Sequence, residues 1–188
     1  MDCKDDIALP SARNCMKKTI FLTTIFALTL AAVGVSAQAP KSPAEAFYKY
    51  DGTHSQVFNR AAIEARKGWF SPELYRLFQY ELKREYAYLK HNPTDKPYFG
   101  DGLPFRPYDE TCKVNGRDSH RTLRIAPEWQ KGSRAVVTAS FSYPKGCTDG
   151  DTVTYTIGMV RGQQGWLIDD VNYGADTSLK QRLNRKEY

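Results

Sequence analysis

Residues 151–174 constrain the fold more than any other part of this sequence. β-Branched and aromatic residues alternate with polar ones from Val153 to Met159, and a second apolar run starts at Trp166. A glycine-containing connection, residues 161–165, separates the two runs. Because side chains alternate between the two faces of a strand, this pattern predicts a β-hairpin.

The hairpin is expected to form the last part of a four-stranded sheet. The candidate strands cover residues 122–127, 133–142, 152–160 and 165–173. The connections between them are short and contain glycine or proline. Short connections favour an antiparallel meander, because parallel neighbours need a long crossover.

Helix signals precede the strands. Ser42 and Pro43 fit an N-cap and a first helical position, and helical periodicity resumes over residues 55–67 after an interruption at 51–54. Near the other end of the chain, Asp176 is the expected N-cap of a short closing helix. No repeat or low-complexity tract separates these segments.

The strongest helix signal covers residues 72–90, where Ser71 and Pro72 supply the start. Its apolar residues recur at three- and four-residue intervals and form one stripe: Leu74, Leu77, Phe78, Leu82, Tyr86 and Leu89. Glu81 and Glu85 lie on the flank of this stripe. We interpret them as part of a solvated helix face rather than as an acid–base pair.

Helices followed by an antiparallel sheet indicate an α+β fold. A sheet with one apolar face needs a cover, and the helix over residues 72–90 offers a matching stripe. We therefore expect N-terminal helices packed on a curved four-stranded antiparallel sheet, in a cone-like arrangement with a mouth. The roughly 150 residues of 40–188 suit a single globular domain.

Residues 1–39 are expected to contain a Sec-type signal peptide. Met16 opens a short basic region, an apolar stretch of about 16 residues follows, and small residues end it near Ala37. The stretch is shorter than the ~20 residues of a spanning helix, which is the alternative interpretation. The acidic lead before Met16 is atypical of a signal peptide, so Met16 is the predicted start. The predicted location is the periplasm or the exterior of a Gram-negative-type cell.

Only two cysteines, Cys112 and Cys147, follow the predicted signal peptide. In an oxidising compartment they are expected to form a disulfide, which would close a loop of roughly 35 residues. A metal pair or reactive thiols are the alternatives, but neither cysteine has a Cys-x-x-Cys partner or a histidine at ligand spacing.

Charge and motifs limit the partners. Removing residues 1–37 takes away four of 27 basic and three of 21 acidic side chains, which leaves a net charge of +5. This value is compatible with a solvated surface or with an anionic envelope partner, and an exported protein meets no nucleic acid. No cofactor is predicted, because the glycines lack dinucleotide spacing, and no metal is predicted, because the three histidines lie far apart in the sequence.

The loop expected over residues 91–106 is rich in proline and glycine. It and the residues after it carry aromatic and charged side chains that are the candidate ligand-binding residues: Tyr98, Asp101, Phe105, Arg106 and Tyr108. Long ordered loops often bind ligands. The alternative is that Phe99 and Phe105 only plug the end of the core.

Asp169 and Asp170 end the last strand, and Asp169 is included among the ligand-binding candidates. Strand alternation would send one carboxylate to each side of the sheet. A carboxylate desolvated inside the cone would have a raised pKa and could act as a general base, so both are weak catalytic candidates. The alternative is that they bond to backbone amides or pair with an arginine such as Arg106.

Several segments together resemble a known family. They are Ala46-Phe47-Tyr48, the segment 69–75 that opens the long helix, the loop 101–105, and the ending 165–173 followed by Ser178-Leu179. Over most of residues 43–184 the chain resembles the YbjP-type bacterial envelope family of unknown function. That resemblance implies a nuclear-transport-factor-2-like, or cystatin-like, fold. It implies no catalytic residue, and the chain departs from many members by lacking a lipobox cysteine.

The expected function is that of a non-catalytic periplasmic accessory module. It would hold a small ligand or a protein segment at the mouth of the cone, between the loop and the Asp169 end of the sheet. The first alternative is a small enzyme with Asp169 or Asp170 as base. The second is an inhibitor or immunity-like protein that acts through its basic surface.

Overall fold

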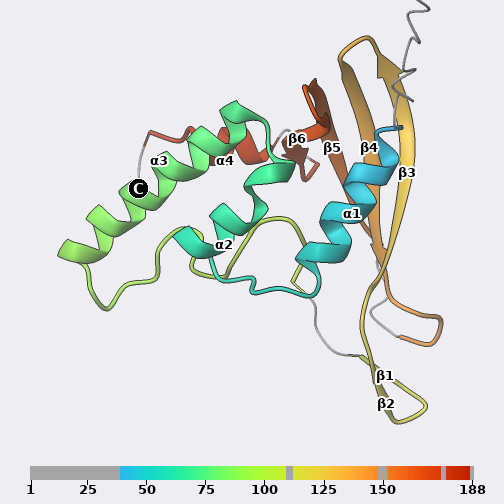
Figure 1. Cartoon of the computed structure of the whole chain (residues 1–188). Coiled ribbons are helices and arrows are strands. Elements are labelled where there is room, and N and C mark those ends of the chain that lie inside the picture. The colour runs from blue at the N-terminus through green and yellow to red at the C-terminus, as the bar shows by residue number, and fades with distance from the viewer. Residues whose placement is uncertain (1–38, 109–111, 148–151, 175–176, 187–188) are drawn as a thin grey trace, which may run out of the picture. The chain divides into compact units, whose positions relative to one another are not determined.

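A computed structural model describes residues 39–108, 112–147, 152–174 and 177–186 (Figure 1). The helices described there are α1 (Lys41–Asp51), α2 (Arg60–Arg66), the 3₁₀ helix η1 (Lys67–Trp69), α3 (Pro72–His91) and α4 (Leu179–Leu183). The strands described there are β1 (Cys112–Val114), β2 (Arg117–Ser119), β3 (Thr122–Lys131), β4 (Arg134–Ser142), β5 (Val153–Gly162) and β6 (Gly165–Asn172). The α+β class is therefore confirmed.

The larger sheet has the strand order β3-β4-β5-β6, and every neighbouring pair is antiparallel. This order confirms the predicted meander. Strand β3 is longer than predicted, because a bulge between Pro127 and Trp129 lets the ladder continue beyond a proline that cannot donate a hydrogen bond. The predicted β5–β6 hairpin closes with Gly162 opposite Gly165.

The small hairpin of β1 and β2 was not expected from the sequence. Its turn is Asn115-Gly116, and both residues have positive φ angles of 52° and 77°. Asn-Gly is a strong signal for a tight hairpin turn, because both central residues tolerate this conformation. The sequence pattern does not indicate these strands, because each has only three residues and neither shows an apolar alternation.

The predicted helix starts are partly correct. Ser71 caps α3, since its hydroxyl accepts a hydrogen bond from the Leu74 amide at 3.1 Å. Ser42 does not cap α1, because that helix begins at Lys41, two residues before the predicted first helical residue Pro43, and its N-cap is Pro40. The second helix starts only at Arg60. Its cap is Asn59, whose side chain accepts from the Ala62 amide at 2.8 Å.

The closing helix α4 is confirmed, with Ser178 as its N-cap. The Ser178 hydroxyl accepts from the Gln181 amide at 3.3 Å, and the Ser178 amide donates to Oε1 of Gln181 at 2.6 Å. The predicted cap, Asp176, lies outside the described residues. So does nearly all of the expected signal peptide, which therefore stays a prediction. None of the helices described has an apolar stretch long enough to span a membrane.

Aromatic side chains from separate segments share one hydrophobic core. The ring of Phe105 lies 4.9 Å from that of Phe47 in α1 and 5.4 Å from that of Phe70, between centroids. The chain just before α3 also joins the sheet, because the Ser71 amide donates to the Ile168 carbonyl of β6 at 2.8 Å. The buried start of α3 therefore agrees with the predicted stripe.

The predicted stripe on α3 extends as far as Leu82, which packs partly buried against the core, and is wrong at Tyr86. Tyr86 is 77% exposed, whereas Glu81 is fully buried and Glu85 is 6% exposed. The prediction that both glutamates lie on a solvated face is therefore also wrong. Two segments distant in sequence supply their partners: Arg185 donates to Glu81 at 2.6 Å, and the Phe99 amide donates to Glu85 at 2.9 Å.

Candidate functional site

The loop that follows α3 is anchored at several points. Besides the bond from the Phe99 amide to Glu85, the Leu103 amide donates to the Gln56 carbonyl at 2.6 Å. The hydroxyl of Tyr173 donates to the Pro104 carbonyl at 2.7 Å. These backbone contacts give the loop one defined path next to α1 and the sheet.

A buried carboxylate, Asp51 at the end of α1, fixes the end of this loop. Arg66 donates from Nε to Oδ1 of Asp51 at 2.9 Å, and Arg106 donates from Nε to Oδ2 at 3.0 Å. Asp51 and Arg66 are almost fully buried, and the side chain of Arg106 is 29% exposed. One carboxylate thus joins α1, α2 and the loop.

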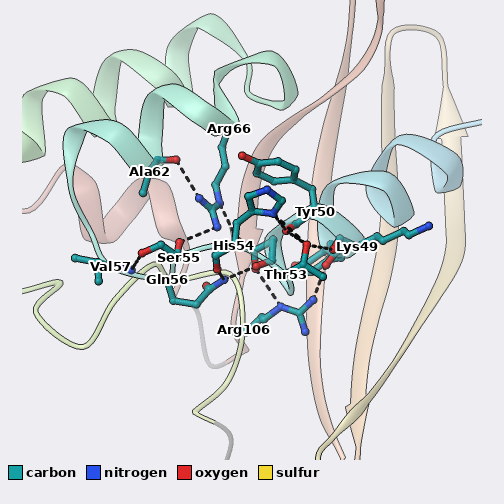
Figure 2. Close-up of polar contacts among 12 residues, drawn as sticks. Lys49, Tyr50, Thr53, His54, Ser55, Gln56, Val57, Ala62, Arg66 and Arg106 are labelled. Carbon is teal, nitrogen blue, oxygen red and sulfur yellow. Dashed lines mark hydrogen bonds and ion pairs between the residues drawn. The ribbon is translucent and has the colours of Figure 1, made fainter.

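Further hydrogen bonds hold the two arginines in place. Figure 2 shows Arg66 reaching the carbonyls of Ala62 and Ser55, at 3.1 and 3.0 Å. Arg106 also donates from Nη2 to the carbonyl of Tyr48. A buried ion pair is stable only when its remaining polar atoms find partners, and this cluster meets that condition for the carboxylate and Arg66.

Asp51 and Arg66 were not predicted from the sequence as site residues. Asp51 precedes Gly52 and was interpreted only as part of the interruption between two helices. Its arginine partners lie 15 and 55 residues away. The one local signal was an acidic residue at the end of an amphipathic helix, which is too common to indicate a buried network.

Arg106 borders an open pocket of about 340 Å³. Lys49 and Thr53 contribute polar groups to the pocket lining, and Leu123 and Ile125 contribute apolar surface. Gly52 leaves room for the guanidinium, because a Cβ atom there would lie 2.5 Å from Nη2 of Arg106 and would displace it. The pocket therefore combines a fixed guanidinium with an apolar wall.

Tyr48 lies between this pocket and the core. Its side chain is fully buried, and its hydroxyl has no hydrogen-bond partner among the described residues. Burial, and then the neighbouring Tyr173 and Asp51, raise the pKa of Tyr48 well above its ordinary value. The phenol therefore stays protonated and keeps a hydrogen to donate.

The structure does not bring the predicted loop residues together. Phe105 is fully buried in the aromatic core. Asp101 is exposed and pairs with Lys96. Tyr98 is half exposed and lies under the guanidinium of Arg185, 3.5 Å from carbon to ring centroid, and Tyr108 is 82% exposed. Of these candidates, Arg106 borders a pocket and is held in place by buried groups.

Asp169 and Asp170 lie at a bulge, where Asp170 pairs with Gly158 and Ile168 pairs with Met159. The bulge interrupts the strict alternation that would place one carboxylate on each side of the sheet. Both side chains contact Lys180: Asp169 accepts from its Nζ at 2.8 Å, and Asp170 accepts from its backbone amide at 2.9 Å.

Lys180 also donates to Glu73 at 2.6 Å. Partial burial opposes the charge on Lys180, but hydrogen bonds to Asp169 and Glu73 outweigh burial and raise its pKa. The Asp169 end of the sheet therefore carries a connected ion-pair cluster. The suggested arginine partner, Arg106, binds Asp51 instead.

Cys112 and Cys147 form the expected disulfide, with Cα atoms 5.8 Å apart. The bond joins β1 to the segment that follows β4. Within the described ranges, no group of three or more histidine, cysteine or acidic side chains could hold a metal ion.

Comparison with known proteins does not indicate a family or a function for this chain. No protein-family model matches the chain, and no curated protein or solved structure matches it significantly. Any function must therefore be inferred from the chain's own residues.

Proposed function

We propose that this protein is a non-catalytic binding module of the bacterial envelope, exported by the signal peptide expected within residues 1–39. Its ligand is a small molecule with a carboxylate and a short apolar body, held in the pocket beside Arg106. The proposal includes the cone-like, cystatin-like arrangement, with the helices on one face of the curved sheet and the loop at its mouth. The expected compartment is the periplasm.

The hydrogen bonding of the Arg106 guanidinium is the observation that carries this proposal. Its Nε and Nη2 atoms are engaged by Asp51 and by the Tyr48 carbonyl, and no described residue accepts a hydrogen bond from Nη1. The planar guanidinium matches a carboxylate in shape and charge. Because buried groups already hold the side chain, little conformational entropy is lost when a ligand binds.

The neighbouring residues support the same ligand class. Lys49 adds a second positive charge and Thr53 a hydroxyl, while Leu123 and Ile125 can cover an apolar group. Glu45 also borders the pocket, but its carboxylate pairs with Lys41 at 3.4 Å. The pocket is too small for a large ligand, since about 340 Å³ is at the lower end for small-molecule sites.

The enzyme alternative requires Asp169 or Asp170 to accept a proton from a substrate. The contacts of both carboxylates with Lys180 favour a structural role for them. The inhibitor or immunity-like alternative requires a protein partner. If native mass spectrometry finds a retained polypeptide instead of a small acid, the inhibitor or immunity-like alternative is favoured.

Native mass spectrometry of the protein purified from its own host tests the proposal. We expect a retained small acid on the wild-type protein and a reduced amount on Lys49→Gln and Arg106→Gln. Lys49 is exposed, so its replacement keeps the test valid if the Arg106 variant folds poorly. Arg134→Gln removes one exposed charge outside the pocket and should retain the acid. Wild-type protein without a retained small acid would overturn the proposal.

A further inference from the structure

A second cleft lies between α3 and the segment that follows α4. Its volume is about 630 Å³. Arg76, Tyr80 and Lys83 line it from one face of α3, at spacings of four and three residues. Arg185 and Lys186 line it from the segment after α4. None of its lining residues belongs to the Arg106 pocket.

Buried Glu81 holds the two sides of this cleft together. It pairs with Arg84 on its own helix and with Arg185 from the segment after α4, which donates from Nη2 at 2.6 Å. Arg84 in turn donates from Nη1 to the Arg185 carbonyl at 2.6 Å and from Nη2 to the Leu183 carbonyl at 3.3 Å. The cleft is therefore formed before any ligand binds.

The cleft has an excess of positive charge. Glu81 is shared by two arginines, whereas Arg76, Lys83 and Lys186 form no ion pair with any residue that the structure describes. No acidic side chain appears among the described lining residues, and Glu187 follows outside them. Cations held close together repel each other, and an anion that bridges them relieves this repulsion.

The geometry points to this cleft as a binding site for a phosphoryl-bearing ligand with two or more negative charges. A single carboxylate carries one charge for three cations, whereas a phosphate or diphosphate group carries two or more charges and several acceptor oxygens. The side chains of Gln79 and Asn184, which also line the cleft, and the Tyr80 hydroxyl can donate further hydrogen bonds. The inference is independent of the function proposed for the Arg106 pocket.

Calorimetric titration of the full-length protein with inorganic pyrophosphate at low ionic strength tests this inference. We expect binding that weakens about tenfold in Arg76→Gln and in Lys83→Gln, because each loses a charge-assisted contact. Lys90→Gln is the matched control, since Lys90 is exposed on the same helix outside the cleft. Its affinity should equal that of the wild type.

Two further arms identify the source of the phosphoryl group. Inorganic phosphate tests a free ion. Flotation with vesicles that contain phosphatidic acid, whose terminal phosphate can carry two negative charges, tests a lipid headgroup, and phosphatidylcholine vesicles are the control. Binding of any of these phosphoryl probes that depends on Arg76 and Lys83 supports the site. The inference is overturned if none of them binds, or if Lys90→Gln weakens binding as much as Lys83→Gln does.

Discussion

At the scale of single residues, the buried carboxylate of Asp51 links three segments, because its two oxygens bind arginines from two other segments. Replacement by asparagine would leave Arg66 buried without its counter-charge. Breaking a buried pair in this way costs about 3–5 kcal/mol.

We therefore expect Asp51→Asn to lower the free energy of unfolding by about that amount, measured by urea denaturation. Glu45→Gln is the control, because it removes an exposed pair with Lys41 and should cost no more than about 1 kcal/mol. Equal effects of the two substitutions would show that the Asp51 network does not stabilise the fold.

The buried carboxyl of Glu85 should make the stability of the protein depend on pH. Burial raises the pKa of its carboxyl above the ordinary value of 4.5, although the bond from the Phe99 amide opposes the shift. Because the folded pKa is raised, the stabilisation from a protonated Glu85 is complete below the unfolded pKa. It is lost as pH rises through the folded value.

Glu85→Gln keeps the acceptor for the Phe99 amide but cannot ionise. The variant should therefore gain stability relative to the wild type as pH rises from about 4.5 toward neutrality, measured by thermal unfolding at a series of pH values. A stability difference that stays constant over this range would contradict the raised pKa.

At the scale of elements, the turn between β3 and β4 depends on Gly132. Its φ angle is +58°, a conformation that residues with a Cβ atom disfavour, although a methyl group added there would have no atom within 4 Å apart from those of Gly132 and its two chain neighbours. Gly132→Ala should therefore destabilise the sheet by about 1–2 kcal/mol through backbone strain alone.

Gly68 in η1 provides a matched comparison. It also has open space around its Cβ position, but its φ angle is not in the positive range. Gly68→Ala should be neutral or stabilising by up to about 1 kcal/mol, because alanine restricts the unfolded chain. If chemical denaturation gives both alanine variants the same free energy of unfolding, the positive φ angle of Gly132 does not cause the predicted loss of stability.

At the scale of the whole molecule, the disulfide joins cysteines 35 residues apart. A crosslink of this length should contribute about 3–4 kcal/mol by restricting the unfolded chain. Cys112→Ala combined with Cys147→Ala should lower the melting temperature to that of the reduced wild type. Reductant should then have no further effect on the variant, and an unreduced digest of the wild type should contain the joined peptides.

Much of the fold follows from local patterns in the sequence. The hairpin of β5 and β6 follows from alternation around a glycine-containing turn, and the start of α3 follows from Ser71 and Pro72. The β1–β2 hairpin could also have been predicted, because Asn115-Gly116 is a recognised turn signal. The long β3 could not, because only its pairing with β4 shows that a bulge accommodates Pro127.

The candidate site was less predictable. Arg106 is a candidate because it lies in a polar loop, but the local signal of its buried partner Asp51, an acidic residue at a helix end, is too common to indicate a buried network. Glu81 and Glu85 have spacing typical of an exposed helix face, and their burial depends on segments that return to α3 from the loop and from the end of the chain. The cleft lined by Arg76 and Lys83 also exists only because the end of the chain packs against α3.

The sequence by itself determined where most of the helices and the four strands of the larger sheet form, because periodicity, caps and turn residues act over a few neighbouring positions. The tertiary structure alone decided which charges are buried, which face each other and which border a pocket. Those properties depend on desolvation and on distances between residues far apart in the chain. Local spacing contains no information about either.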